Sequence, residues 1–280
     1  MTSNGYKTFQ FFKYAIYAFL AFNVYLFFVE EWAALATRFA DGVSLGELIS
    51  AFPATIDTAS WVVLLLMFEL ETYVLDDRHF TPRVKFSLHA LRASCYAVIV
   101  YAFYGYLSKA LFLAAAVPLN DVTDLCSLVG EHWSYAVDLD DYQPLDFSNC
   151  IEFGGASEYL QFRGLNAIVD PAGFVDIMRL AWVDVINAGV WILVVLVLET
   201  DVRLQEHMRL QGMAYRVSTA AKFVLYSVLL LAAIYWWIKG DFVDFWDAFL
   251  WLVAFVFIEL NVFEWRKETL GDQSGATRAA

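Results

Sequence analysis

Long apolar runs separated by charged segments dominate the pattern of hydrophobic and polar positions along this chain. A helix needs roughly 20 such residues to cross a hydrocarbon core of about 30 Å. Six runs come close to or exceed that length: Phe11–Val29, Thr58–Leu75, Ala90–Ala116, Val185–Leu204, Ala220–Ile238 and Phe245–Phe263. Backbone polar groups cannot stay unpaired in lipid, so these runs predict helices. The predicted fold class is therefore all-α, a polytopic membrane protein with six transmembrane helices.

Consecutive pairs of these helices carry the same residue types at the same spacing, which predicts three tandem two-helix repeats. In each second helix an Asp or Asn precedes a Trp by four residues. A Glu follows that Trp by eight residues, and another polar residue comes two positions later. The three sets are Asp57, Trp61, Glu69 and Glu71; Asn187, Trp191, Glu199 and Asp201; and Asp247, Trp251, Glu259 and Asn261.

The first helix of each pair repeats as well, with a basic residue four positions before a tyrosine. The pairs are Lys13 and Tyr17, Arg92 and Tyr96, and Lys222 and Tyr226. Because both patterns recur three times in the same order, chance is a poor explanation. We expect a single membrane domain over residues 1–280, with repeats at about 11–77, 86–206 and 216–266. The polar tail at 269–280 is expected to be disordered.

Helical rise places three acids and three bases at a similar depth. At 1.5 Å per residue, Glu69 lies about 18 Å from Asp57, and Arg92 lies about 10 Å inside Lys85. Charges at such depth cost several kcal/mol unless they are paired, hydrated or able to reach the surface. The sequence thus predicts a charge layer near the cytoplasmic side, made of Glu69, Glu199, Glu259, Lys13, Arg92 and Lys222.

Three interpretations of this layer remain open. The acids and bases could form ion pairs that lock the repeats together, or they could line an ion pathway or gate. Metal binding by the paired acids is the least favoured, because residues i and i+2 point about 200° apart on a helix and no His joins them. One acid of each pair should face the axis and the other a neighbouring helix or subunit. The second acids and the tyrosines form a secondary polar set: Glu71, Asp201, Asn261, Tyr17, Tyr96 and Tyr226.

Lys and Arg counts set the expected orientation. One side of the membrane would carry thirteen of them and the other only five, which predicts an integral plasma (inner) membrane protein with both termini cytoplasmic. The chain is 60% hydrophobic and 18% charged, and its net charge of −13 excludes nucleic acid as an expected partner. Expected partners are the lipid bilayer and either further copies of the chain or other membrane subunits. Trp61, Trp191 and Trp251 are expected to anchor helices at headgroup level.

The connection over residues 118–174 is long enough to form a small ordered unit outside the membrane. Cys126 and Cys150 both lie in it, and two cysteines in an oxidising compartment predict a disulfide. The alternative is a pair of buried free thiols. Further towards the N-terminus, Ser44 and Glu47 have capping-box spacing, which predicts a short surface helix ending before Pro53.

The favoured function is membrane transport, by a cation channel or carrier. The alternative is a non-transporting membrane subunit or scaffold of a larger complex. Residues 62–68, 192–198 and 252–258 are wholly apolar, which argues against an open water-filled pore within one chain. A gated pore, a lipid-facing helix or a pore between subunits remains compatible with this pattern. No nucleophile–base pair, zinc-protease motif or phosphate loop is present, so neither an enzyme nor a cofactor is expected. In organisation alone the repeats resemble mitochondrial carriers, whose Pro-x-acid-x-x-base motif is absent here.

Overall fold

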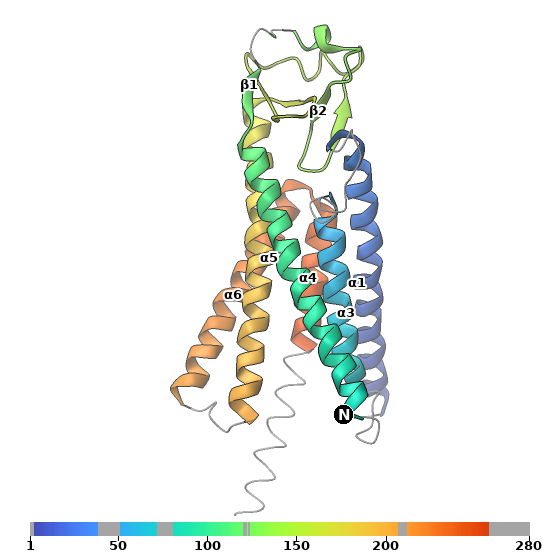
Figure 1. Cartoon of the computed structure of the whole chain (residues 1–280), viewed down its shortest axis with the longest axis vertical. Coiled ribbons are helices and arrows are strands. Elements are labelled where there is room, and N and C mark those ends of the chain that lie inside the picture. Colours follow the sequence, from blue (N-terminus) through green and yellow to red (C-terminus); the bar gives the residue numbers. More distant parts are fainter. Residues whose placement is uncertain are drawn as a thin grey trace, which may run out of the picture. The chain divides into compact units, whose positions relative to one another are not determined.

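Helices make up most of the structure. The computed structural model describes residues 3–38, 51–71, 81–119, 122, 124–206 and 212–257. Its helices are α1 (Ser3–Arg38), α3 (Pro53–Glu69), α4 (Pro82–Ala114), α5 (Pro171–Glu206) and α6 (Met213–Lys239), followed by a helix over 242–257 (Figure 1). The chain divides into two compact units, one of residues 24–225 and the other of residues 1–23 together with 226–280.

Four helices of the described residues are long and apolar enough to cross a membrane. They cover Phe9–Leu35, Pro82–Ala114, Pro171–Leu204 and Met213–Lys239. The two other predicted spans, 58–75 and 245–263, run past the described residues at 72–75 and 258–263. The predicted surface helix at 44–52 and the tail at 269–280 lie largely or wholly outside them too.

The helices extend beyond the apolar runs because local capping residues set their ends. Thr81 begins α4, where its hydroxyl accepts the Val84 N–H at 3.4 Å and Pro82 takes the first helical position. Asp170 caps α5 in the same way, with its carboxylate accepting the Gly173 N–H at 2.9 Å. Glycine allows this approach, since a Cβ on residue 173 would meet that oxygen at 2.6 Å.

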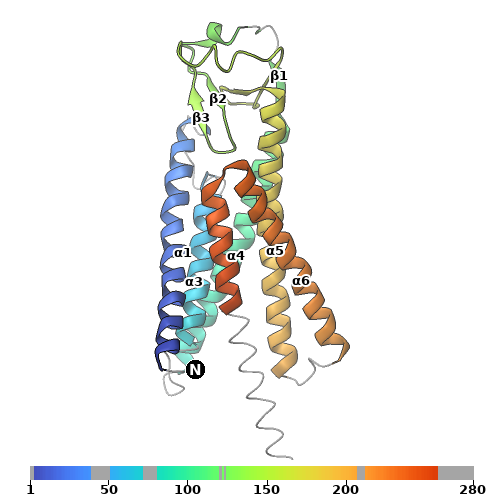
Figure 2. The same cartoon turned by 180° about the vertical axis from the view of Figure 1, so that it is seen from behind.

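A five-stranded sheet lies between α4 and α5 in the sequence, and we call residues 115–170 the sheet domain (Figures 1 and 2). Its strands are β1 (Val117–Leu119), β2 (Ser134–Ala136), β3 (Tyr142–Pro144), β4 (Tyr159–Gln161) and β5 (Ala167–Val169), in the spatial order β1-β4-β5-β2-β3. Among the described strands, β2 and β5 pair in parallel and the other pairs are antiparallel. The sheet corrects the all-α prediction: strands of three residues are too short to leave a periodic signal in the sequence.

The core of the sheet domain is apolar and covalently closed. One cluster of buried side chains in this core consists of Leu125, Leu128, Leu145, Cys150, Tyr159 and Ile168. Cys126 and Cys150 form the predicted disulfide, which is confirmed, and Cys95 on α4 is a buried free cysteine. Tyr135 stacks on Phe153 with ring centroids 4.2 Å apart. The long connection is therefore an ordered domain.

Candidate functional site

Arg92 on α4 forms an ion pair with Glu71, which follows the last turn of α3. The distance from Arg92 Nη2 to Glu71 Oε2 is 2.6 Å, and both side chains are half-buried. Arg92 lies about 15 Å along α4 from Pro82. The guanidinium thus neutralises a carboxylate of a neighbouring helix well inside the length of α4.

A second ion pair joins α6 to α5. Lys222 Nζ lies 3.2 Å from Asp201 Oδ2, and the Ser218 hydroxyl donates to the same oxygen at 2.6 Å. Ser218 and Lys222 stand one helical turn apart, so both reach Asp201 from one face of α6. This pair is more enclosed than the first, with side chains only 19% and 9% exposed.

Glu199 differs from these acids, since its partner is neutral. The Tyr96 hydroxyl donates to Glu199 Oε1 at 2.9 Å, joining α4 to α5. Asp201, two residues further along α5, contacts α6 instead, as the 200° separation of positions i and i+2 requires. Among the described residues no cationic side chain is ion-paired with Glu199.

Two bases of the predicted charge layer, Arg92 and Lys222, therefore form ion pairs with acids of the secondary polar set. Arg92 pairs with Glu71, and Lys222 pairs with Asp201. Helical spacing alone could not tell which acid of a pair faces which neighbour. Lys13, Glu69 and Tyr17 are buried, and Lys13 Nζ lies 4.9 Å from the centre of the Tyr14 ring. Tyr226 is partly buried, and Glu259 and Asn261 lie outside the described residues.

The three tryptophans of the pattern are buried, which corrects their prediction as headgroup anchors. Trp61, Trp191 and Trp251 are 8%, 6% and 5% exposed. Trp61 and Trp191 contact each other with ring centroids 6.4 Å apart. The physical reason is that packing against another helix removes more apolar surface than an interfacial position does.

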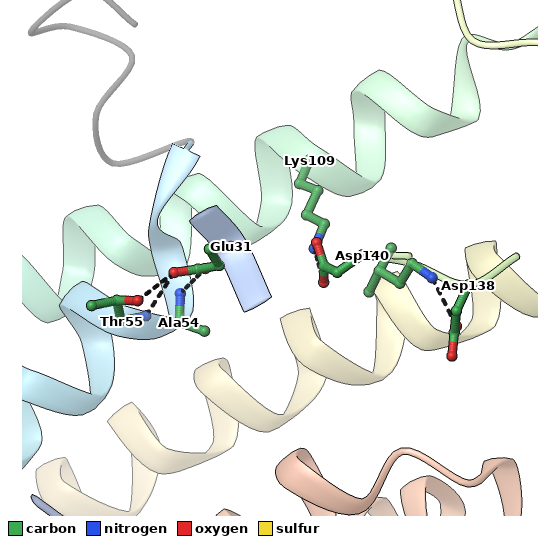
Figure 3. Close-up of polar contacts among 7 residues, drawn as sticks. Glu31, Ala54, Thr55, Lys109, Asp138 and Asp140 are labelled. Carbon is green, nitrogen blue, oxygen red and sulfur yellow. Dashed lines mark hydrogen bonds and ion pairs between the residues drawn. The ribbon is translucent and has the colours of Figure 1, made fainter. Parts of the chain in front are cut away.

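A further polar cluster lies where α1, α3, α4 and the sheet domain meet (Figure 3). Helix α3 begins at Pro53, and Phe52 before it offers no capping oxygen. The buried Glu31 of α1 supplies the cap: its carboxylate accepts the N–H of Ala54 at 2.7 Å, and the N–H and hydroxyl of Thr55 at 3.1 and 2.6 Å. The positive end of the α3 helix dipole also stabilises a carboxylate at this position.

In the same region the β2–β3 turn of the sheet domain meets α4 (Figure 3). Lys109 Nζ contacts the two carboxylate oxygens of Asp140 at 2.7 and 2.9 Å, and the lysine is buried. Leu139 beside Asp140 is buried too, and the Val137 N–H donates to the Asp141 carbonyl at 2.9 Å to close the turn. The sequence analysis did not predict this contact. The signal for it was the position of Lys109 inside the apolar run 90–116, because a lysine there needs an acidic partner.

Two titrating groups of the sheet domain are displaced from their ordinary ranges. Burial raises the pKa of Tyr135 to about 12, helped by the Asp170 carboxylate, which accepts its hydroxyl at 3.0 Å. Hydrogen bonds from Ser148 and Asn149 lower the pKa of the exposed Asp146. Within the described residues no group of three or more His, Cys, Asp or Glu side chains could hold a metal ion.

Together, fold and site define a helical protein with four helices able to span a membrane, interhelical ion pairs and a disulfide-bonded sheet domain. Comparison with family models, curated proteins and solved structures finds no match to this chain.

Proposed function

We propose that this chain is a cation transport protein of the plasma (inner) membrane. In this proposal it crosses the membrane six times, as three repeats of a two-helix hairpin, and both termini are cytoplasmic. The recurring Asp/Asn, Trp and Glu spacing supports the repeats, and the uneven distribution of Lys and Arg supports the orientation. The charge layer would then lie near the cytoplasmic side.

The contrast between Glu199 and Asp201 carries the proposal. Asp201 already has a lysine within 3.2 Å, so a transported cation would have to displace that lysine. Glu199 receives a hydroxyl from Tyr96 at 2.9 Å and has no ion-paired base among the described residues. It can bind a cation or a proton without breaking an ion pair. Ionisable residues inside membrane helices are functional candidates by default.

A flux assay on the purified protein in liposomes tests this. We expect wild-type protein to dissipate a proton or monovalent-cation gradient, and Glu199→Gln to lower that flux by about tenfold, corresponding to roughly 1.4 kcal/mol. The matched control is Thr200→Ala, the adjacent exposed residue, whose hydroxyl bonds only back to Leu196 O in its own helix. Equal flux in wild type and Glu199→Gln, or no flux above that of empty liposomes, would contradict the proposal.

One observation favours a second candidate, a non-transporting subunit of a larger membrane complex. Phe147 and Ile151 are 79% and 78% exposed on the sheet domain. They stand four residues apart in a helical turn, where the Cys150 N–H bonds to Asp146 O and the Phe153 N–H to Asn149 O. Adjacent exposed apolar side chains are typical of interaction surfaces.

The second candidate predicts a mass that depends on this surface. Protein gently solubilised from its own membranes would migrate as a larger complex, and Phe147→Ser with Ile151→Ser would reduce the mass to that of the chain alone. The transport proposal expects the double variant to keep both its mass and its flux.

A further inference from the structure

Asp247 and Asn23 form a polar contact between the helix over 242–257 and α1. Asn23 is fully buried, and its side-chain N–H donates to Asp247 Oδ1 at 2.8 Å. Trp251, one turn after Asp247, donates its indole N–H to the same carboxyl group. Both donors are neutral.

No charged side chain of the described residues is hydrogen-bonded or ion-paired to Asp247. The nearest titratable residue on the helix over 242–257 is Asp244, one turn before Asp247. On α1 the titratable residues nearest to Asn23 are Tyr25, Tyr17 and Glu30, and its nearest basic residue is Lys13, about 15 Å further along the helix. On α6 the titratable residues towards its end are Tyr235 and Lys239. A carboxylate placed here has hydrogen bonds but no bonded counter-charge, a costly arrangement in an apolar surrounding.

The amide of Asn23 shows the complementary defect. Its Oδ1 atom is buried and has no hydrogen-bond partner in the described part of the chain. A buried acceptor without a donor loses its hydration and receives nothing in return. The amide group is planar, so this unpaired oxygen lies beside the nitrogen that already contacts Asp247.

We infer that Asp247 and Asn23 form a proton-binding site. A proton taken from water converts the carboxylate into a carboxylic acid, which gains an O–H donor and loses its charge. The acid and the amide can then pair through two hydrogen bonds, Asn23 N–H to one carboxyl oxygen and Asp247 O–H to Asn23 Oδ1. The same proton removes the uncompensated charge and satisfies the unpaired amide oxygen.

The equivalent position of the second helical hairpin offers a natural comparison. Asn187 stands four residues before Trp191, as Asp247 stands four before Trp251. Its Oδ1 atom is also buried and without a partner among the described residues. An amide takes up no proton at physiological pH, so we assign proton binding to Asp247 and not to Asn187. Proton binding at Asp247 requires no transport activity.

Infrared spectroscopy of the full chain in lipid nanodiscs tests the site, because a protonated carboxylic acid has a carbonyl stretch distinct from that of a carboxylate. We expect such a band at neutral pH, shifted by isotope labelling of the aspartate side-chain carboxyl carbon. Asp247→Asn should abolish it. Asn23→Ala should displace it to higher frequency, because the acid O–H loses its acceptor. The control Glu131→Gln, on the exposed surface of the sheet domain, should leave it unchanged.

Two outcomes overturn the inference: no labelled aspartic acid band in wild-type protein at neutral pH, or a band that survives in Asp247→Asn. If Asp247→Asn fails to fold, the isotope shift and the response of the band to Asn23→Ala test the site instead. A band whose frequency does not change in Asn23→Ala also overturns the inference. None of these readouts is a flux. A protein that binds the proton but moves no ion would refute the transport proposal and leave this site intact.

Discussion

Different interactions stabilise the sheet domain and the helices α3 to α6. The sheet domain closes its apolar core with a disulfide between Cys126 and Cys150, and the Lys109–Asp140 ion pair links it to α4. The helices α3 to α6 are joined instead by Arg92–Glu71, Tyr96–Glu199 and Lys222–Asp201. In addition to apolar burial, the sheet domain has a covalent crosslink, whereas the helices have two interhelical ion pairs and a hydrogen bond from a tyrosine to a carboxylate.

This difference predicts different responses to change. Apolar burial and a disulfide tolerate the loss of any one polar group on the surface, because no charge is left without a partner. A buried ion pair does not, since removing one partner strands the other. Among the helices, each buried charge has a desolvation cost that a partner must offset.

The largest expected effect comes from breaking the most enclosed pair. Lys222→Met should lower the free energy of unfolding by about 3–5 kcal/mol, because Asp201 is left buried with only the Ser218 hydroxyl. The double variant Lys222→Met with Asp201→Leu should recover most of that loss. Denaturant titration of the protein in mixed micelles measures both.

The matched control for this prediction is an exposed pair. Arg179 and Asp176 lie 3.6 Å apart on α5, with side chains 63% and 49% exposed. Arg179→Met should change stability by less than about 1 kcal/mol. If Lys222→Met and Arg179→Met cost the same, enclosure of the Lys222–Asp201 pair does not raise its contribution to stability.

Next in size is the disulfide, which spans 24 residues. Opening a loop of this length should cost the sheet domain about 3 kcal/mol. Reductant should therefore raise hydrogen exchange in β2 and β5 while exchange within α5 stays unchanged. Cys95→Ala serves as the control because the Cys95 thiol is free. The response of this variant to reductant should match that of wild type. Equal exchange with and without reductant in the strands would contradict the prediction.

A smaller effect is expected where the two regions touch. Asp140→Asn leaves the buried Lys109 with a neutral partner, which should cost about 1–3 kcal/mol and loosen the β2–β3 turn. Protease cleavage near residues 137–141 measures this loosening. Asp141→Asn makes the same charge change one residue later, on an exposed side chain, and should leave cleavage unchanged. Equal cleavage in Asp140→Asn and Asp141→Asn would show that Lys109 does not hold the turn.

The sequence predicted the long helices and the disulfide but not the pairing of polar groups. Long apolar runs predict helices directly, because in lipid the backbone N–H and C=O groups of such a run must hydrogen-bond to one another. Capping residues such as Thr81 and Asp170 then extend α4 and α5 beyond those runs. Partners distant in sequence, such as Glu31 and Thr55, leave no local pattern, so the cap of α3 was not predictable. The strands were missed because each has only three residues, and several pair with residues distant in sequence, as β1 does with β4.

The smallest expected effect separates the two regions by pH. In the folded sheet domain the pKa of Tyr135 is raised to about 12, whereas an unfolded tyrosine titrates near 10. Folding therefore favours the neutral phenol, and this contribution to stability is fully present below pH ~10 and is lost as pH rises through about 12.

Tyr135→Phe should cost about 1 kcal/mol at neutral pH by removing the hydrogen bond to Asp170. Because the Phe variant has nothing to titrate at this position, the stability difference between it and wild type should shrink over that pH range. Hydrogen exchange of β2 at a series of pH values, corrected for intrinsic rates, measures the difference. A difference that stays constant with pH would mean that the pKa of Tyr135 is the same in the folded and unfolded states, and would contradict the prediction.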